Sequence, residues 1–399
     1  MKLIVILTYL AAVCYEFILD YLNYKNRNAP LPDNVKDVYD EETYVRRSQY
    51  SMEHLRLDIF SSMSTTVLSL LYLTLNVHNY LFNVGIGFTP NLYLQTGFMM
   101  GAVMLLELLI GIPFNVVSTF KIEQKYGFNK STVKTFIGDI IKQLLILAVV
   151  GFGLLSLFIW LYGKIGDTVF SAFFFVLVGL SVILNFFFHV FSKIFNKFKP
   201  LEDGMLKTKV EELARKTGYS VKRIFVMDAS KRSTKINAYF AGFGRNKTIV
   251  LYDTMLESLS EDEIIGILAH ELGHFKKKHT VLNFVLGLVS MAILLLGAQF
   301  IVTQEAVSAA FGFEEPNLAF GMLVFFVLYA PVAKVLAIPR NIISRKFEYA
   351  ADKFAAEYAD KEAFISSLKK IHSLNYANLS PHPLVVLASY SHPPLMATA

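Results

Sequence analysis

Residues 267–289 read ILAHELGHFKKKHTVLNFVLGLV and place two different signals next to each other. In the first half, two histidines lie four residues apart with a glutamate directly after the first, a pattern typical of metal sites that activate water. In the second half, an apolar run begins that is long enough to enter a bilayer. The stretch therefore predicts a hydrolytic centre at the end of a membrane span, where water is scarce.

The composition indicates an integral membrane protein. Of the 399 residues, 54% are hydrophobic and 18% are charged, and 35 are Phe. Soluble domains of ordinary composition carry about 25% charged residues. The single cysteine, Cys14, excludes an internal disulfide.

Apolar stretches near the roughly 20 residues that cross a bilayer occur seven times. The first of them has features of a cleaved signal peptide or lipoprotein signal, but its apolar character continues past Cys14, so we expect a retained span. The seven expected spans are residues 3–23, 62–84, 95–118, 142–163, 168–191, 280–303 and 317–338.

The connections between these spans alternate in basic charge. Residues 24–61 hold six Lys and Arg and residues 119–141 hold four, whereas residues 85–94 and 304–316 hold none. Because cytoplasmic loops carry the excess of Lys and Arg, the pattern predicts an outside N-terminus and a cytoplasmic segment 192–279. The same pattern accounts for the net charge of +6, so no nucleic-acid partner is expected.

The expected fold is mainly α: a seven-helix membrane protein with a small α/β protease insert. In the insert, short β-branched and aromatic runs predict strands, and Ser260 with Glu263 forms a capping-box pattern that predicts the start of the histidine helix. The four expected parts are spans 1–5 with their loops (1–191), the α/β insert (192–279), spans 6 and 7 (280–338) and a C-terminal segment that completes the site (339–399).

The candidate metal site begins with His270 and His274, which project from one face of a helix. We interpret them as zinc ligands and Glu271 as the base that deprotonates the bound water. The alternative is a pair of surface histidines without a metal. His279, which ends the same basic stretch, is expected to cap the helix and not to bind metal.

A catalytic zinc takes a third protein ligand and keeps an open position. The segment ISRKFEYAADKFA offers Glu348 and Asp352, four residues apart on one helical face. We assign Glu348 as the ligand and Asp352 as the carboxylate that orients a histidine, with one Zn²⁺ per chain. The alternative is a solvated helix next to the membrane with ordinary charges.

These segments together resemble the type I CAAX prenyl endopeptidases, the zinc proteases that include the yeast a-factor-converting enzyme. The resemblance covers almost the whole chain and rests on HELGHFKKKHT, ISRKFEYAADKFA, FKIEQKYGFNKST, PLEDGMLK, NAYFAGFGRNKTIVLYDTML, NLSPHPL and YSHPPL in this order. It implies the same three ligands and base, and a water-filled chamber between the spans. It also implies substrate or transition-state contacts from Asn237 and His392. One departure is Thr398, which stands where the family carries an arginine.

The expected function is a membrane-embedded zinc endopeptidase that cleaves near the C-terminus of prenylated or other membrane-associated peptides and proteins. His392 is expected to donate to the oxyanion, and the strand around 236–242 to bind the substrate, with Asn237 fixing its backbone. The expected partners are peptide substrate and membrane lipid, in a bacterial cell membrane or an endoplasmic reticulum membrane. Two alternatives remain: a quality-control protease of the HtpX type, and a non-catalytic scaffold or transporter. The sequence leaves the oligomeric state open.

Overall fold

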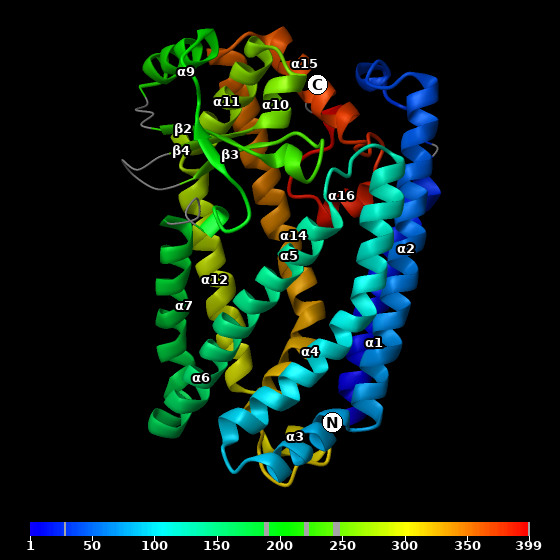
Figure 1. The fold of residues 1–399 in the computed structure, drawn as a ribbon, viewed down its shortest axis with the longest axis vertical. Helices are drawn as coiled ribbons and strands as arrows, with labels where there is room; N and C mark the ends of the chain where they lie inside the picture. Colours follow the sequence, from blue (N-terminus) through cyan, green and yellow to red (C-terminus); the bar gives the residue numbers. More distant parts are fainter. Residues whose placement is uncertain (28, 187–190, 219–222, 242–247, 398–399) are drawn as a thin grey trace.

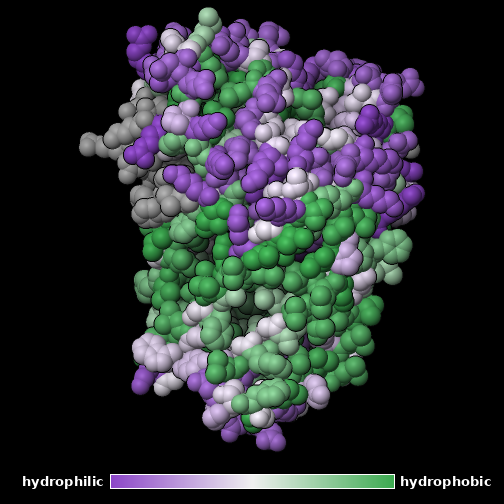
Figure 2. Space-filling model, in the orientation of Figure 1, coloured by the Kyte–Doolittle hydropathy of each residue, from purple (hydrophilic) through white to green (hydrophobic). Residues whose placement is uncertain are grey.

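A computed structural model describes residues 1–27, 29–186, 191–218, 223–241 and 248–397. Long helices run along the molecule and carry a small sheet and several short helices at one end (Figure 1). An apolar belt crosses the lower half of the face shown in Figure 2, with polar surface concentrated above it and some polar residues at the lower end. Within the described residues, six helical stretches are long and apolar enough to cross a membrane: Lys2–Asn26, Glu41–Thr74, Leu92–Glu123, Val133–Asn185, His279–Gln299 and Leu318–Tyr358.

The second predicted span, residues 62–84, is wrong. Helix α2 runs from Glu41 to Thr74, so it begins inside the segment expected to be a loop. Asn76 then takes a left-handed conformation (φ 54°) and separates α2 from the 12-residue helix α3, Val77–Phe88. Because α3 is too short to cross a bilayer, the crossing lies along α2.

The fourth candidate span contains two helical arms. The first arm consists of α5 (Val133–Ile146), the π-helical turn η3 (Leu147–Gly151) and α6 (Phe152–Ile165). A short turn, η4, follows at Gly166–Thr168, and α7 then covers Val169–Phe186. The count of seven crossings therefore depends on how this hairpin sits in the membrane, and it stays a prediction.

Helix α14 connects the membrane part to the head, because its 41 residues run without a break from Leu318 to Tyr358. It contains both the predicted span 317–338 and the segment with Glu348 and Asp352. The expected division between residues 338 and 339 falls inside this one helix. A single helix, which contains Pro331 and Pro339, therefore joins the apolar part of the chain to the candidate metal site.

The head confirms the three strands predicted around residues 222–228, 236–243 and 247–253, and it contains a fourth, Phe198–Pro200, that the sequence pattern does not predict. Its four strands lie in the order β1-β2-β4-β3, with β2 and β4 parallel and the other pairs antiparallel. Strand β3 pairs with β4 and forms an edge of this sheet among the described residues. The strands are β1 (Phe198–Pro200), β2 (Arg223–Met227), β3 (Ala238–Ala241) and β4 (Thr248–Tyr252).

Helix α11, Glu261–Lys276, carries the histidine motif and confirms the predicted capping box. The Ser260 hydroxyl accepts from the Glu263 backbone N–H, and the Glu263 carboxylate accepts from the Ser260 N–H at 2.8 Å. Leu268 and Leu272 pack in a core with residues of the sheet, α14 and the following helix α15. At Gly273 a Cβ would lie 3.1 Å from the Ala351 Cα, so the glycine of HELGH lets α11 and α14 touch.

The remaining elements frame these parts. They are α1 (Lys2–Asn26), η1 (Asp33–Val35), α4 (Leu92–Val117), η2 (Ser118–Glu123), α9 (Met205–Lys216), η5 (Ala229–Lys231), α10 (Asp253–Ser258), α12 (His279–Gln299), α13 (Glu305–Ala309), α15 (Lys361–Leu374), α16 (Pro383–Ser389) and η6 (Leu395–Ala397).

Candidate active site

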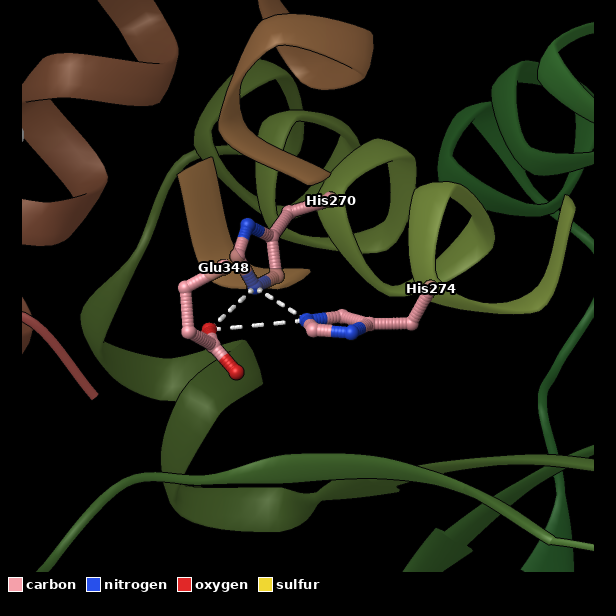
Figure 3. A group of neighbouring side chains, drawn as sticks. All are labelled: His270, His274 and Glu348. Carbon is pink, nitrogen blue, oxygen red and sulfur yellow. Dashed lines mark hydrogen bonds and ion pairs between the residues drawn. The ribbon is translucent and has the colours of Figure 1, made fainter. Parts of the chain in front are cut away.

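Three side chains converge where α11 meets α14 (Figure 3). His270 and His274 project from α11, one turn apart, and Glu348 points at them from α14. Glu348 Oε2 lies 3.3 Å from His270 Nε2 and 3.4 Å from His274 Nε2, and the two Nε2 atoms are 3.1 Å apart. Two helices from distant parts of the sequence thus bring three lone-pair donors to one point.

These donors fit a zinc ion by type and spacing. Zinc binds imidazole nitrogen and carboxylate oxygen at about 2.0–2.2 Å, so tetrahedral ligands lie roughly 3.3 Å from one another. The observed spacings of 3.1, 3.3 and 3.4 Å agree with that separation. The carboxylate is also 93% buried, and a buried carboxylate needs a cation or hydrogen-bond donors.

Asp352 lies behind the first histidine. Its Oδ1 is 2.8 Å from His270 Nδ1, the ring nitrogen that does not face Glu348. The contact has the distance of an ion pair, although the hydrogen-bond angle is not met, and a carboxylate beside Nδ1 favours the tautomer that leaves the Nε2 lone pair free. The structure therefore places Asp352 where the spacing of four residues from Glu348 predicts it.

His279 lies behind the second histidine, and its predicted role as a helix cap is wrong. Lys278 is the N-cap of α12, while the His279 side chain is buried and its Nδ1 lies 3.1 Å from His274 Nδ1. The His279 ring also stacks on Phe347, with centroids 4.3 Å apart and planes at 10°. Sequence reasoning missed this contact because it depends on the left-handed conformation of Lys278 (φ 61°), which turns the chain between α11 and α12.

A cavity of about 610 Å³ opens onto the three converging side chains. Glu271 lines it, and burial raises the pKa of the Glu271 carboxyl. Polar residues of the membrane helices also line it, namely Ser181 and Asn185 of α7 and Thr280 and Asn283 of α12. Polar side chains on membrane-spanning helices are tolerated where they line a cavity, and these four face the cavity of the three converging side chains.

The C-terminal segment brings His392 to the same cavity. His392 Nε2 lies 3.4 Å from Glu348 Oε1, and the imidazole is 73% exposed, so it is open to a ligand. Arg345, one turn before Glu348, donates to the carbonyl oxygens of Val386 and Tyr390 at 2.9 and 2.5 Å. This arginine, which the motifs do not single out, fixes the segment that carries His392.

Asn237 is not brought to the cavity by its side chain. It is exposed, directly before β3, and its Oδ1 accepts from the Ala238 N–H at 2.8 Å. Its carbonyl accepts from the Tyr252 N–H, which ties it to β4. Its expected role at the substrate backbone stays a prediction. Thr398, the position of the expected arginine, lies outside the described residues.

Known proteins resemble this chain along its whole length. Residues 20–197 match a family described as "CAAX prenyl protease N-terminal, five membrane helices", and residues 200–397 match peptidase family M48. A CAAX prenyl protease 1 homolog of Oryza sativa is 32% identical over 96% of this chain and 92% of its own length. CAAX prenyl protease 1 of Saccharomyces cerevisiae is 30% identical over 99% of this chain and 93% of its own length.

A solved structure shares the fold. The crystal structure of S. mikatae Ste24p superposes with a TM-score of 0.91 at 29% identity, covering 99% of this chain and 97% of that one. The arrangement of long helices and head described above is therefore that of an experimentally determined protein.

Proposed function

This chain belongs to peptidase family M48, among the CAAX prenyl proteases, and we propose that it cleaves CAAX-type proteins next to their prenylated cysteine. It is a membrane metalloendopeptidase. The observation that carries the proposal is the convergence of two imidazoles and one carboxylate at zinc-ligand spacing. The full-length match favours this function over an HtpX-type quality-control protease and over a non-catalytic scaffold.

We propose that His270, His274 and Glu348 hold one zinc ion, with Asp352 and His279 fixing the two imidazoles from behind. A bound zinc ion supplies a Lewis acid for the scissile carbonyl and lowers the pKa of a water molecule. The contacts of Asp352 and His279 matter because they act on the far nitrogen of each imidazole, and a histidine binds metal only through an unprotonated nitrogen.

Glu271 is the proposed proton carrier. It lines the cavity next to both histidines, and its raised pKa brings the carboxyl nearer to the pH at which it works. It takes a proton from the attacking water and passes it to the leaving amine. His392, open to the cavity, donates a hydrogen bond to the oxyanion.

We propose that the substrate adds to the sheet as a further strand along β3. An edge strand presents unpaired backbone N–H and C=O groups, and peptides bind to such edges by main-chain hydrogen bonds. Asn237, at the start of β3 and exposed, would fix the substrate backbone there. The proposal is supported by the position of β3 at the end of the order β1-β2-β4-β3.

The proposed topology has seven crossings, with the hairpin of α6 and α7 supplying two of them and the zinc site on the cytoplasmic side. The basic loops support this orientation. The cavity of 610 Å³ would form part of a larger water-filled chamber between the spans.

Purified protein offered farnesylated and unfarnesylated versions of one peptide tests the proposal. We expect cleavage after the modified cysteine, with a higher kcat/KM for the farnesylated peptide. The matched control is His270→Ala, which removes one ligand. Zinc-loaded wild-type protein that cleaves neither peptide would contradict the proposal.

A further inference from the structure

Arg47 on α2 is a buried charge without a partner. Its side chain is 96% buried, and its Nε has no hydrogen-bond partner. Among the residues that the structure describes, no ion pair or side-chain hydrogen bond joins Arg47 to a partner. Arginine stays protonated in proteins, and an unpaired buried charge is strongly unfavourable. A ligand with negative charge would remove this cost.

The guanidinium of Arg47 lines a pocket of about 250 Å³ between α1, α2 and the C-terminal segment. Other hydrogen-bond donors line it too: the guanidinium of Arg27, the phenol of Tyr390 and the hydroxyl of Ser48. Arg27 is held in place, since its Nη1 donates to the Tyr24 carbonyl at 2.8 Å and its guanidinium lies 4.0 Å from the Tyr24 ring centroid. The pocket therefore contains one arginine that Tyr24 holds in place, Arg27, and one whose Nε has no partner, Arg47.

The pocket also holds two carboxylates, Asp20 and Asp58, at its other end. Asp20 lies seven residues before Arg27, which is about 10 Å along the axis of α1. Asp58 lies eleven residues after Arg47, which is about 16 Å along the axis of α2. Helices α1 and α2 lie side by side, and the cations are nearer to the end that carries the head (Figure 1). In the membrane leaflet on the side of the head, an aminophospholipid holds its phosphate closer to the membrane centre than its ammonium. The phosphate would then lie near the two carboxylates and the ammonium near the two arginines. The charge pattern thus disfavours a lipid headgroup.

The C-terminal segment contributes to the lining of both this pocket and the cavity at the proposed zinc ligands. Tyr390 lines the pocket, and His392 faces Glu348 at 3.4 Å. Two residues of extended chain span at most about 7 Å. Arg345 holds this segment through the Tyr390 carbonyl. Tyr390, which lines the pocket together with the two arginines, is therefore held close in the chain to His392 at the proposed zinc ligands.

We propose that Arg47, with Arg27 and Tyr390, binds the C-terminal carboxylate of the substrate peptide. The inference rests on the proposed function, and it adds a reason why cleavage occurs close to a chain end. The three residues after a CAAX cysteine extend about 10 Å, so a carboxylate at their end can reach beyond the cavity while the scissile bond stays at the zinc ligands. Arginine suits this role because its planar fork binds carboxylates through two parallel hydrogen bonds.

The test compares two farnesylated peptides that differ only in their last group, a free carboxylate or an amide. Wild-type enzyme should cleave the carboxylate peptide with a kcat/KM roughly 10- to 100-fold higher, as expected for a charge-assisted hydrogen bond. Arg47→Met should lower kcat/KM for the carboxylate peptide until it is within about twofold of the value for the amide peptide. The value of kcat/KM for the amide peptide should stay the same. Arg46→Met is the matched control, because Arg46 is exposed on the neighbouring position and should keep the preference.

Equal cleavage of both peptides by wild type would overturn the proposal while leaving the protease function intact. An Arg47→Met loss that is equal for both peptides would also overturn it, because it would indicate a structural role. If Arg47→Met does not fold, Arg47→Lys, which keeps the charge but not the fork, should retain part of the preference. If wild type cleaves neither peptide, the protease function fails, and binding of the carboxylate and amide tripeptides to wild type and Arg47→Lys decides the proposal separately.

Discussion

Asp352 Oδ1 lies 2.8 Å from His270 Nδ1, while His270 Nε2 faces Glu348 at 3.3 Å. One imidazole thus lies between two carboxylates on successive turns of α14; in the proposed site the first binds the metal and the second holds a proton. Both turns belong to α14, which is long and apolar enough to cross a membrane, so one helix carries both a candidate span and these two carboxylates.

Asp352→Asn should weaken zinc binding without removing a ligand. The amide cannot carry the negative charge that keeps the proton on His270 Nδ1, and such outer partners commonly contribute 10- to 100-fold in metal affinity or activity. Competition with a chelator measures the effect. Glu357→Gln, an exposed change on the same helix, should leave the affinity unaltered. Equal zinc affinity in Asp352→Asn and wild type would mean that the contact is incidental.

His279→Phe should also weaken zinc binding, by about tenfold or more. The substituted ring can keep the stacking on Phe347, but it loses the nitrogen that lies 3.1 Å from His274 Nδ1. Thermal unfolding of the metal-free protein is the control, because retained stacking predicts a small change in Tm. A large fall in Tm with unaltered zinc affinity would assign His279 to packing alone.

Glu263 should make folding stability depend on pH. Burial raises the pKa of its carboxyl, but hydrogen bonds from Lys370, Ser366 and Ser260 outweigh burial and lower the pKa to about 2. A folded pKa below the unfolded value near 4.5 means that the stabilisation is fully present above pH 4.5 and is lost as the pH falls towards 2.

Glu263→Gln therefore should be destabilised at neutral pH by roughly 1.5–3 kcal/mol, the range for a charged hydrogen-bonded group. The difference in Tm between wild type and this variant, followed from pH 7 downwards, should stay constant to about 4.5 and then shrink. A difference that grows as the pH falls would contradict the assignment.

The positions of exposed loops provide a test of orientation. Tags at residue 90 and between residues 314 and 315 should be labelled from the non-cytoplasmic side, and a tag after residue 202 from the cytoplasmic side only. The charge pattern gives the physical reason, since the first two loops lack Lys and Arg. Labelling of residues 202 and 314 from the same side would exclude the seven-crossing topology.

Local signals in the sequence predicted much of the site. His270 and His274 lie one turn apart on a capped helix, and Glu348 and Asp352 repeat the same spacing, so helical geometry alone places each pair on one face. The strands of the head follow from β-branched runs, which prefer a pleated, half-buried surface.

Other features depend on tertiary contacts that no local pattern encodes. The break after Thr74 arises where Asn76 takes a left-handed conformation, although the apolar run continues to Phe88. The contact of His279 with His274 needs a similar kink at Lys278. The Arg47 pocket combines residues more than 300 positions apart in the sequence, Arg47 and Tyr390, and becomes visible only in the folded chain.

The most direct test of the account is Glu271→Gln, with zinc content and peptide turnover measured on the same purified sample. Glutamine keeps the size of the side chain but cannot accept the proton of the attacking water. Because Glu271 lines the cavity and is not one of the three converging donors, zinc should stay at one per chain. Turnover should fall by at least about 100-fold, the lower range for losing general acid–base catalysis. Near-normal turnover with bound zinc would contradict the proposed mechanism.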